Sequence, residues 1–176
     1  MQFLRTDICI CFITLAFANS VYFVNQDATT RTIVFTSNPG QTSVEPIHVE
    51  GNSATYQKFP VGWAGNWYSV RQGATDMPGI LGEVRFNGFA GATYFDVSAI
   101  LNPNDNEGVK VIFPAHINEP ISGCQNFPCP NAYMDADDLL TASTFSKDLV
   151  CLVGNLPERK KTREAARRFI HTIVLR

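Results

Sequence analysis

Short runs of β-branched and aromatic residues recur along the chain, and Gly, Pro, Asn or Asp residues separate them. Runs bounded in this way predict β-strands. We expect the first two strands, 21–25 and 32–36, to form a hairpin, and the β domain to close on the apolar run 149–154. The remaining predicted strands cover 44–49, 55–59, 67–72, 80–86, 93–98 and 109–113. This spacing predicts a β-sandwich or a β-barrel.

Two central strands indicate which side chains face the core. Residues 83–86 and 94–97 alternate polar with apolar side chains. Because successive side chains of a strand point to opposite faces, we expect one face of each strand to be buried and the other to present charge. Glu83, Arg85 and Asp96 belong to the charged set.

The composition agrees with one β-rich domain. The chain has 176 residues, of which 17% are charged and 11% aromatic, together with 12 Gly and 10 Pro. These values argue against a coiled coil, a helical bundle or a disordered tail protein. Residues 21–154 contain 6 basic and 13 acidic side chains, which gives this part a charge of 6 − 13 = −7. A body of this sign repels nucleic-acid phosphates, so we expect no nucleic-acid partner.

The N-terminal segment resembles an export signal. Arg5 is followed by the apolar run 8–17, and Ala16-Phe17-Ala18 follows the small-x-small rule that precedes a cleavage site. Residues 1–20 are therefore predicted to be a secretory signal peptide, and the protein to be secreted. The run is shorter than the roughly 20 residues that a membrane-spanning helix needs, so we expect no membrane span.

The C-terminal segment differs in charge from the rest of the chain. Residues 155–176 contain 7 basic and 2 acidic side chains, and Ala165, Phe169 and Ile173 recur at helical spacing. We expect a short basic helical extension that lies outside the fold of the β domain 21–154. The alternative is an amphipathic helix that contacts lipid or cell wall.

Cleavage of the signal peptide would leave Cys124, Cys129 and Cys151. An odd number in an oxidising compartment predicts one disulfide and one remaining thiol. Three single bridges are possible among three cysteines, and the residues alone leave all of them open.

Three parts of the chain resemble thaumatin-like proteins, in the order in which that family has them. Residues 21–26 with 32–34 resemble the opening strands, and 81–88 with 94–98 resemble the central strand pair. Cys129-Pro130-Asn131-Ala132-Tyr133 is similar to the family's loop that closes on a later cysteine. The resemblance implies an all-β fold, a thaumatin-like antiparallel β-sandwich. Plant members are longer and rich in disulfides, so this chain looks more like small secreted fungal members.

The resemblance also implies particular site residues. It places Glu83 and Asp96 in an acidic cleft thought to act on β-glucans, with Asp105 as a third acid. It favours a disulfide between Cys129 and Cys151. Two carboxylates on adjacent strands can act as acid and base on a glycosidic bond. They can equally bind a ligand without chemistry, or lie on a solvated face and pair with Arg85 or Arg71.

Aromatic residues form a second candidate surface in the Gly-rich segment 59–68. Aromatic rings stack on sugars or anchor protein contacts, whereas the competing interpretation is core packing, above all for Trp67. The predicted ligand-binding set is Glu83, Arg85, Asp96, Asp105, Trp63 and Tyr68.

Other catalytic or metal sites have weak support. Asp135, Asp137 and Asp138 match no standard calcium loop, and a solvated loop is the favoured interpretation. His48 and His116 lie in unmatched contexts, which disfavours a metal-dependent nuclease. We expect neither a metal nor a cofactor.

The sequence as a whole favours a secreted, non-enzymatic thaumatin-like protein that acts by extracellular binding. Its expected partner is an extracellular glycan or a plant apoplastic protein, because some fungal proteins with a thaumatin-like core are elicitors of plant defence. The alternative is binding or hydrolysis of β-glucan through an acidic cleft. A secreted nuclease is a third function, since some of those proteins are labelled deoxyribonuclease-like.

Overall fold

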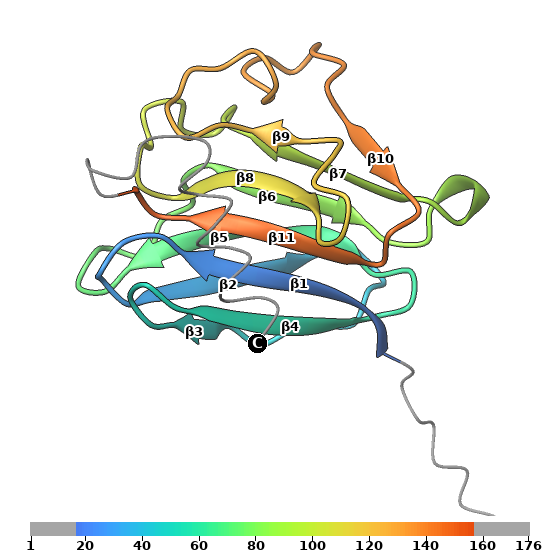
Figure 1. Cartoon of the computed structure of the whole chain (residues 1–176), viewed down its shortest axis with the longest axis horizontal. Helices are drawn as coiled ribbons and strands as arrows, with labels where there is room; N and C mark the ends of the chain where they lie inside the picture. The colour runs from blue at the N-terminus through green and yellow to red at the C-terminus, as the bar shows by residue number, and fades with distance from the viewer. Residues whose placement is uncertain (1–16, 157–176) are drawn as a thin grey trace, which may run out of the picture.

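The computed structural model describes residues 17–156 as two β-sheets packed face to face (Figure 1). The first sheet has the order β4-β1-β11-β8-β9 and the second β10-β7-β6-β5-β2-β3. The all-β prediction is thus confirmed. The predicted signal peptide up to residue 16 and the C-terminal extension from residue 157 lie outside the described residues.

The elements are β1 (Phe17–Asn25), β2 (Arg31–Ser37), β3 (Ile47–Val49), β4 (Ala54–Pro60), β5 (Ala64–Arg71), β6 (Leu81–Arg85), η1 (Phe89–Gly91), β7 (Thr93–Ser98), β8 (Val109–Pro114), β9 (Ser122–Gly123), β10 (Ala142–Thr144) and β11 (Asp148–Val153).

Aromatic side chains fill the space between the sheets. Trp67 is fully buried, and its ring packs edge-on against Phe23 at 5.4 Å between centroids. The ring centroid of Phe59 lies 4.6 Å from that of Trp63 and 5.5 Å from that of Phe86. Each fully buried ring of this size contributes about 2 kcal/mol of hydrophobic stabilisation. This core fixes the strands of the second sheet, which carry the acidic residues.

The predicted hairpin of the first two strands is wrong. β1 pairs with β4 and, in parallel, with β11, whereas β2 pairs with β3 and β5 in the other sheet. Residues 26–30 therefore cross from one sheet to the other instead of turning within one. A buried amide supports this crossing, because Asn25 donates to the backbone oxygens of Thr29 at 2.7 Å and of Val49 at 3.2 Å.

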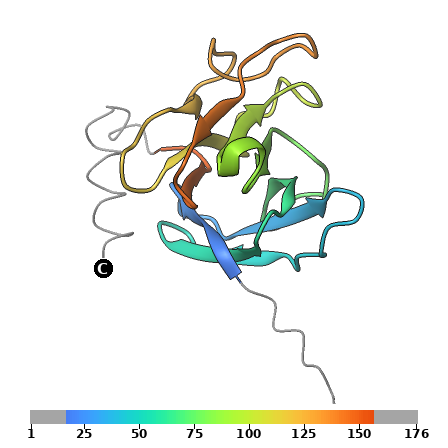
Figure 2. The ribbon, with the colours of Figure 1, turned by 90° about the vertical axis from the view of Figure 1, so that its right-hand side faces the viewer.

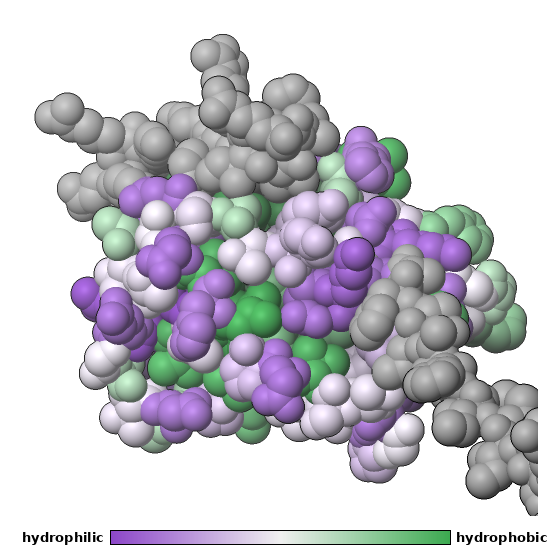
Figure 3. Space-filling view, turned by 90° about the horizontal axis from the view of Figure 1, so that it is seen from below, coloured by the Kyte–Doolittle hydropathy of each residue, from purple (hydrophilic) through white to green (hydrophobic). Residues whose placement is uncertain are grey.

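Strands β8 and β11 are buried on both faces. One set of their side chains joins the central core, and the alternate set belongs to a second apolar cluster on the outward face of the first sheet. Such strands have nearly continuous apolar sequences, as 149–153 does. The cluster consists of Val24, Val111, Phe113, Val150 and Leu152. From below the sandwich, apolar residues also gather in the middle of the surface, among polar ones (Figure 3).

The strands run between two ends of the sandwich. At the near end, defined as the end where β1 begins, lie the β2–β3, β4–β5, β6–β7, β8–β9 and β10–β11 connections. At the far end, where β1 finishes, lie the β1–β2, β3–β4, β5–β6 and β7–β8 connections. Figure 2 faces the near end, with η1 toward the viewer.

Candidate functional site

Glu83 and Asp96 lie directly opposite each other on adjacent strands. The register pairs Glu83 of β6 with Asp96 of β7, and both side chains are half-buried. The flanking residues Val84, Phe95 and Val97 point into the core, so the alternation of the strands turns the two acids outward. Directly opposed side chains on one face have Cβ atoms about 5 Å apart. The structure therefore brings together the two acids that the sequence singled out.

The environment of Asp96 favours its protonated form. Burial, the negative charge of Glu83 and hydrogen bonding with that carboxyl together raise the pKa of Asp96 to about 7, against a smaller lowering by Thr141. Atom Oδ1 of Asp96 is buried and has no hydrogen-bond donor in the described residues. A buried acceptor facing a second carboxyl is satisfied when one proton is shared between the two groups. Asp96 is therefore largely protonated below neutral pH, beside the carboxyl of Glu83.

A second connection reaches the acid pair from the loop that precedes β10. The hydroxyl of Thr141 donates to Oδ2 of Asp96 at 3.3 Å, and the Tyr133 hydroxyl lies 2.7 Å from the Thr141 oxygen. The backbone of Tyr133 is held along β7, because its N–H donates to Val97 and its carbonyl accepts from Ala99. Sequence analysis missed both polar residues. The motif at 129–133 contained a signal for Tyr133, whereas nothing marked Thr141.

An open depression lies beside the acid pair. Arg85 and Tyr94 are the next pair along β6 and β7 on the same face. They line a hollow of about 570 Å³ together with Asn87, Gly88 and Phe89. Arg85 is exposed. The acid pair and the depression therefore form one continuous surface with acceptors, a cation and an aromatic ring.

Asp105 has a different role from the predicted one. Its carboxylate accepts backbone N–H groups of Ile80 at 2.8 Å, Glu107 at 2.9 Å and Gly108 at 3.0 Å. These bonds hold the β7–β8 loop against the start of β6. Because its oxygens already have three donors, Asp105 stabilises the far end and is not a third acid beside Glu83 and Asp96.

The predicted aromatic recognition surface is also corrected. Trp63 is fully buried, and its ring nitrogen donates to the Thr42 carbonyl at 3.0 Å and the Ser37 hydroxyl at 3.2 Å. Tyr68 is only 9% exposed and donates to Asp76 at 2.9 Å. Neither ring presents a face to solvent, so core packing is the role of both.

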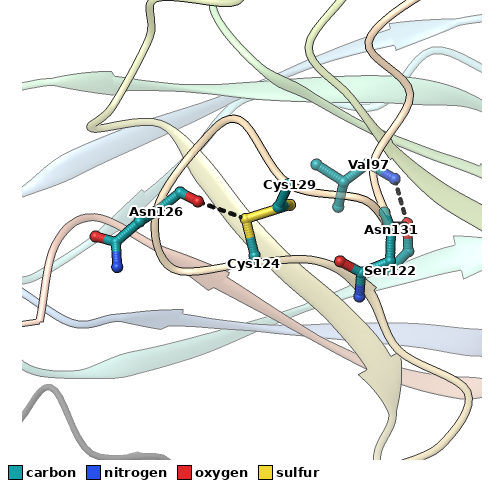
Figure 4. Close-up of a disulfide and its surroundings, with 6 residues drawn as sticks. All are labelled: Val97, Ser122, Cys124, Asn126, Cys129 and Asn131. Atoms are coloured by element: carbon teal, nitrogen blue, oxygen red, sulfur yellow. Dashed lines mark hydrogen bonds between the residues drawn. A yellow bond between two sulfur atoms is a disulfide. The ribbon is translucent and has the colours of Figure 1, made fainter.

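The disulfide joins Cys124 to Cys129, which corrects the predicted bridge between Cys129 and Cys151 (Figure 4). Cys151 is inward-facing on β11, fully buried, and has a free thiol. Its burial raises the pKa of the thiol to about 12, against a smaller lowering by the hydrogen bond from the Trp67 ring nitrogen. A loop cysteine cannot reach a side chain that the sheet directs into the core.

The bridged loop is pinned to β7. The Ser122 hydroxyl accepts the Val97 N–H at 2.9 Å and donates to the Asn131 carbonyl at 3.2 Å (Figure 4). These bonds fix both sides of the disulfide loop. The disulfide therefore belongs to the support of the site, since the loop continues to Tyr133 and Thr141.

The acidic cluster near residue 135 has a local structural role. Asp138 accepts backbone N–H groups of Met134 at 2.8 Å and Asp135 at 3.0 Å, and these bonds lower the pKa of Asp138. Within residues 17–156, no set of three or more His, Cys, Asp or Glu side chains is arranged to hold a metal ion. In the same range, no helix is long and apolar enough to cross a membrane.

Comparison with known proteins gives one clear relationship. No family model matches the chain. Antigenic protein SchS21 of Stachybotrys chartarum is 49% identical over 135 residues, which is 77% of this chain and 94% of the relative. Similarity of this extent and level means that the chain belongs to the family of this fungal antigenic protein.

Proposed function

We propose that the protein is a secreted binding protein that recognises neutral, hydroxyl-rich glycans through Glu83, Asp96 and the adjacent depression. The observation that carries the proposal is the directly opposed acid pair, in which burial and Glu83 raise the pKa of Asp96 to about 7. Sugar hydroxyls both donate and accept hydrogen bonds. A singly protonated pair offers donor and acceptor together, and Tyr94 adds a ring beside it on which a sugar face can stack.

The geometry favours binding over hydrolysis. Glycosidases of either stereochemistry separate their two carboxyl groups by about 5 Å or more, to admit the sugar or a water molecule. Glu83 and Asp96 lie directly opposite each other on adjacent strands, and hydrogen bonding between their carboxyls contributes to the raised pKa of Asp96, so we propose that the pair binds rather than cleaves a glycan. The alternative, β-glucan hydrolysis, would need the pair to open.

Secretion and the thaumatin-like relationship are parts of the same proposal. The apolar run before residue 18 supports export. Strand β1 begins at Phe17, and Asn19 and Ser20 are buried within it. Cleavage after Ala18 would therefore leave the strand nearly complete. The disulfide and a fungal relative described as antigenic are consistent with a protein outside the cell.

The proposal is tested by retention of the mature protein on insoluble β-1,3-glucan. We expect Glu83→Gln and Asp96→Asn each to weaken retention about tenfold, because the first removes a carboxylate and the second removes the carboxyl proton of the pair. Glu119→Gln, at an exposed acid in the β8–β9 connection, is the matched control and should bind normally. Retention should fall as the pH rises through 7, because a covering ligand would then bury two charges.

Three outcomes would contradict the proposal. Equal retention of the wild type and both acid-pair variants would show that Glu83 and Asp96 do not form the glycan-binding site. Release of reducing sugar by the wild type, lost in the variants, would replace binding with hydrolysis. Metal-dependent cleavage of plasmid DNA by the same preparation would make the protein a nuclease.

The elicitor function stays a prediction with its own test. Infiltration of the wild-type protein into leaves should trigger a defence response. If the acid pair binds the host component, Asp96→Asn should weaken that response while Glu119→Gln does not.

A further inference from the structure

Four of the five connections at the near end each carry one exposed bulky apolar side chain. Their exposed fractions are 54% for Val61, 85% for Phe89, 63% for Ile117 and 79% for Phe145. Val61 lies between β4 and β5, Phe89 between β6 and β7, Ile117 between β8 and β9, and Phe145 between β10 and β11. The near end, whose backbone faces the viewer in Figure 2, thus presents four separate apolar tips.

Hydrogen bonds connect these loops to one another. The N–H of Gly62 donates to Asn87 at 3.3 Å, which joins the loops of Val61 and Phe89. The N–H of Ala115 donates to the Asp148 carbonyl at 2.9 Å, which joins the loop of Ile117 to the start of β11. β10 pairs with β7, so Phe145 follows a strand adjacent to the one that begins after η1. The four tips therefore belong to one surface.

Charge distinguishes the two ends. The ion pairs of residues 17–156, Arg31 with Asp27 and Arg71 with Glu107, both lie at the far end. The exposed cations with no ion pair in this range are at or close to the near end: Lys58, Arg85 and Lys147. Arg85 borders the same depression as Phe89, and Lys147 follows Phe145 by two residues.

Acidic side chains are more numerous at the far end. The far-end connections contain Asp27, Glu50, Asp76, Asp105 and Glu107. At the near end Glu45 and Glu119 are exposed, and Asp148 accepts a hydrogen bond from Ser20. The far end also has exposed apolar residues, Met77, Ile100 and Leu101, but they lie among these acids. The far end is therefore net acidic, whereas the near end has as many exposed cations as acids, so an anionic surface would be repelled by the far end and not by the near end.

The chemistry of the tips indicates their partner. A glycan surface favours planar aromatic platforms, but Val61 and Ile117 are aliphatic and offer no ring to stack. Mixed aliphatic and aromatic tips beside Arg and Lys suit the boundary between lipid headgroups and acyl chains, where apolar groups insert and cations contact phosphate. We propose that the near end docks peripherally on the surface of an anionic phospholipid bilayer.

The proposal is tested with the purified mature protein and two kinds of vesicle, phosphatidylcholine alone and phosphatidylcholine mixed with phosphatidylserine. We expect the wild type to sediment with the mixed vesicles and much less with the neutral ones. The double variant Val61→Ser/Phe145→Ser should bind the mixed vesicles about tenfold more weakly. The matched far-end variant Met77→Ser/Leu101→Ser should bind like the wild type. All four substituted side chains are exposed, so circular dichroism should show both variants folded.

The charge contribution is tested separately by Lys147→Gln. We expect about fivefold weaker binding to the mixed vesicles, because one basic residue near an anionic surface contributes a factor of that size. Binding to neutral vesicles should stay unchanged. The difference between the two vesicle types separates the contribution of tip insertion from the contribution of attraction to phosphate.

Several outcomes would overturn the proposal. These are no sedimentation of the wild type, equal sedimentation with both vesicle types, or equal loss in the near-end and far-end variants. Dimerisation that the near-end substitutions abolish, without vesicle binding, would make the surface a protein interface. Glu83→Gln should lose glycan retention but keep vesicle binding, so the two proposals fail independently.

Discussion

Asp96 and Asp105 are both partly buried acids, yet their surroundings differ in the number of hydrogen-bond donors. Asp105 accepts three backbone N–H groups and holds two loops together. Asp96 faces Glu83, and one of its oxygens has no donor in the described residues. A carboxylate surrounded by donors stabilises a fold, whereas two acids that share too few donors retain a capacity to bind. The following substitutions test this contrast.

Asp105→Ala should have the largest effect. It leaves three backbone N–H groups without their acceptor, one of them on the fully buried residue Ile80. We expect the free energy of unfolding to fall by about 3 kcal/mol, as measured by urea titration. Asp105→Asn keeps one acceptor oxygen and should lose about half as much. A loss below about 1 kcal/mol for the alanine variant would show that the loops are held by other contacts.

Asp96→Asn should instead raise the free energy of unfolding. In the folded protein Asp96 keeps its proton up to a pH of about 7, whereas its ordinary pKa is 3.8. The wild type therefore loses stability as the pH rises between these values, and an amide does not. We expect a gain of about 1–2 kcal/mol at pH 8, reduced because the pair is partly open to solvent.

Urea titrations of the wild type and Asp96→Asn near pH 4 and at pH 8 measure this effect. Most of the gain should vanish at the lower pH, because the unfolded wild type is then about half protonated at its ordinary pKa of 3.8. A destabilised amide variant at pH 8 would mean that Asp96 is paired with a cation.

Glu83→Gln should shift the titration of Asp96 itself. The substitution removes the neighbouring negative charge but leaves Asp96 half-buried. The pKa of Asp96, followed by NMR of its carboxyl carbon, should therefore fall below 7 but stay above its ordinary value. An unchanged titration would mean that burial alone controls Asp96.

Thr141→Val should give the smallest change. The Thr141 hydroxyl donates to Asp96 and lowers its pKa, against the larger effects of burial and Glu83. Its loss should raise the pKa of Asp96 slightly in the same NMR titration. Thr144→Val, on the strand that follows, serves as a control because Thr144 does not contact the acid pair.

The strands were predictable because local patterns determine them. Predicted strand 93–98 is Thr93–Ser98 in the structure, and predicted strand 109–113 is Val109–Pro114. β9 and β10 were missed because they have only two and three residues, and their pairing depends on the long neighbours β8 and β7. The false hairpin of 21–25 and 32–36 arose because a short connection fits a hairpin or a crossing between sheets equally well.

The site was only partly predictable. Period-two alternation was enough to place Glu83 and Asp96 on one outward face, and the register then made them direct neighbours. Asp105 was misassigned because its three donors come from the backbone, which leaves no trace in side-chain patterns. Thr141 reaches Asp96 from 45 residues away, and such contacts depend on the tertiary fold.

The buried thiol of Cys151 can report how often the β-sandwich opens. The sulfur is enclosed by the core, and its neighbours on β11 are equally shielded. An alkylating reagent can reach it only when the sheets separate, so the rate of modification in native buffer counts these openings. Mass spectrometry of alkylated Cys151 would therefore measure the openings of the sandwich without any engineered label.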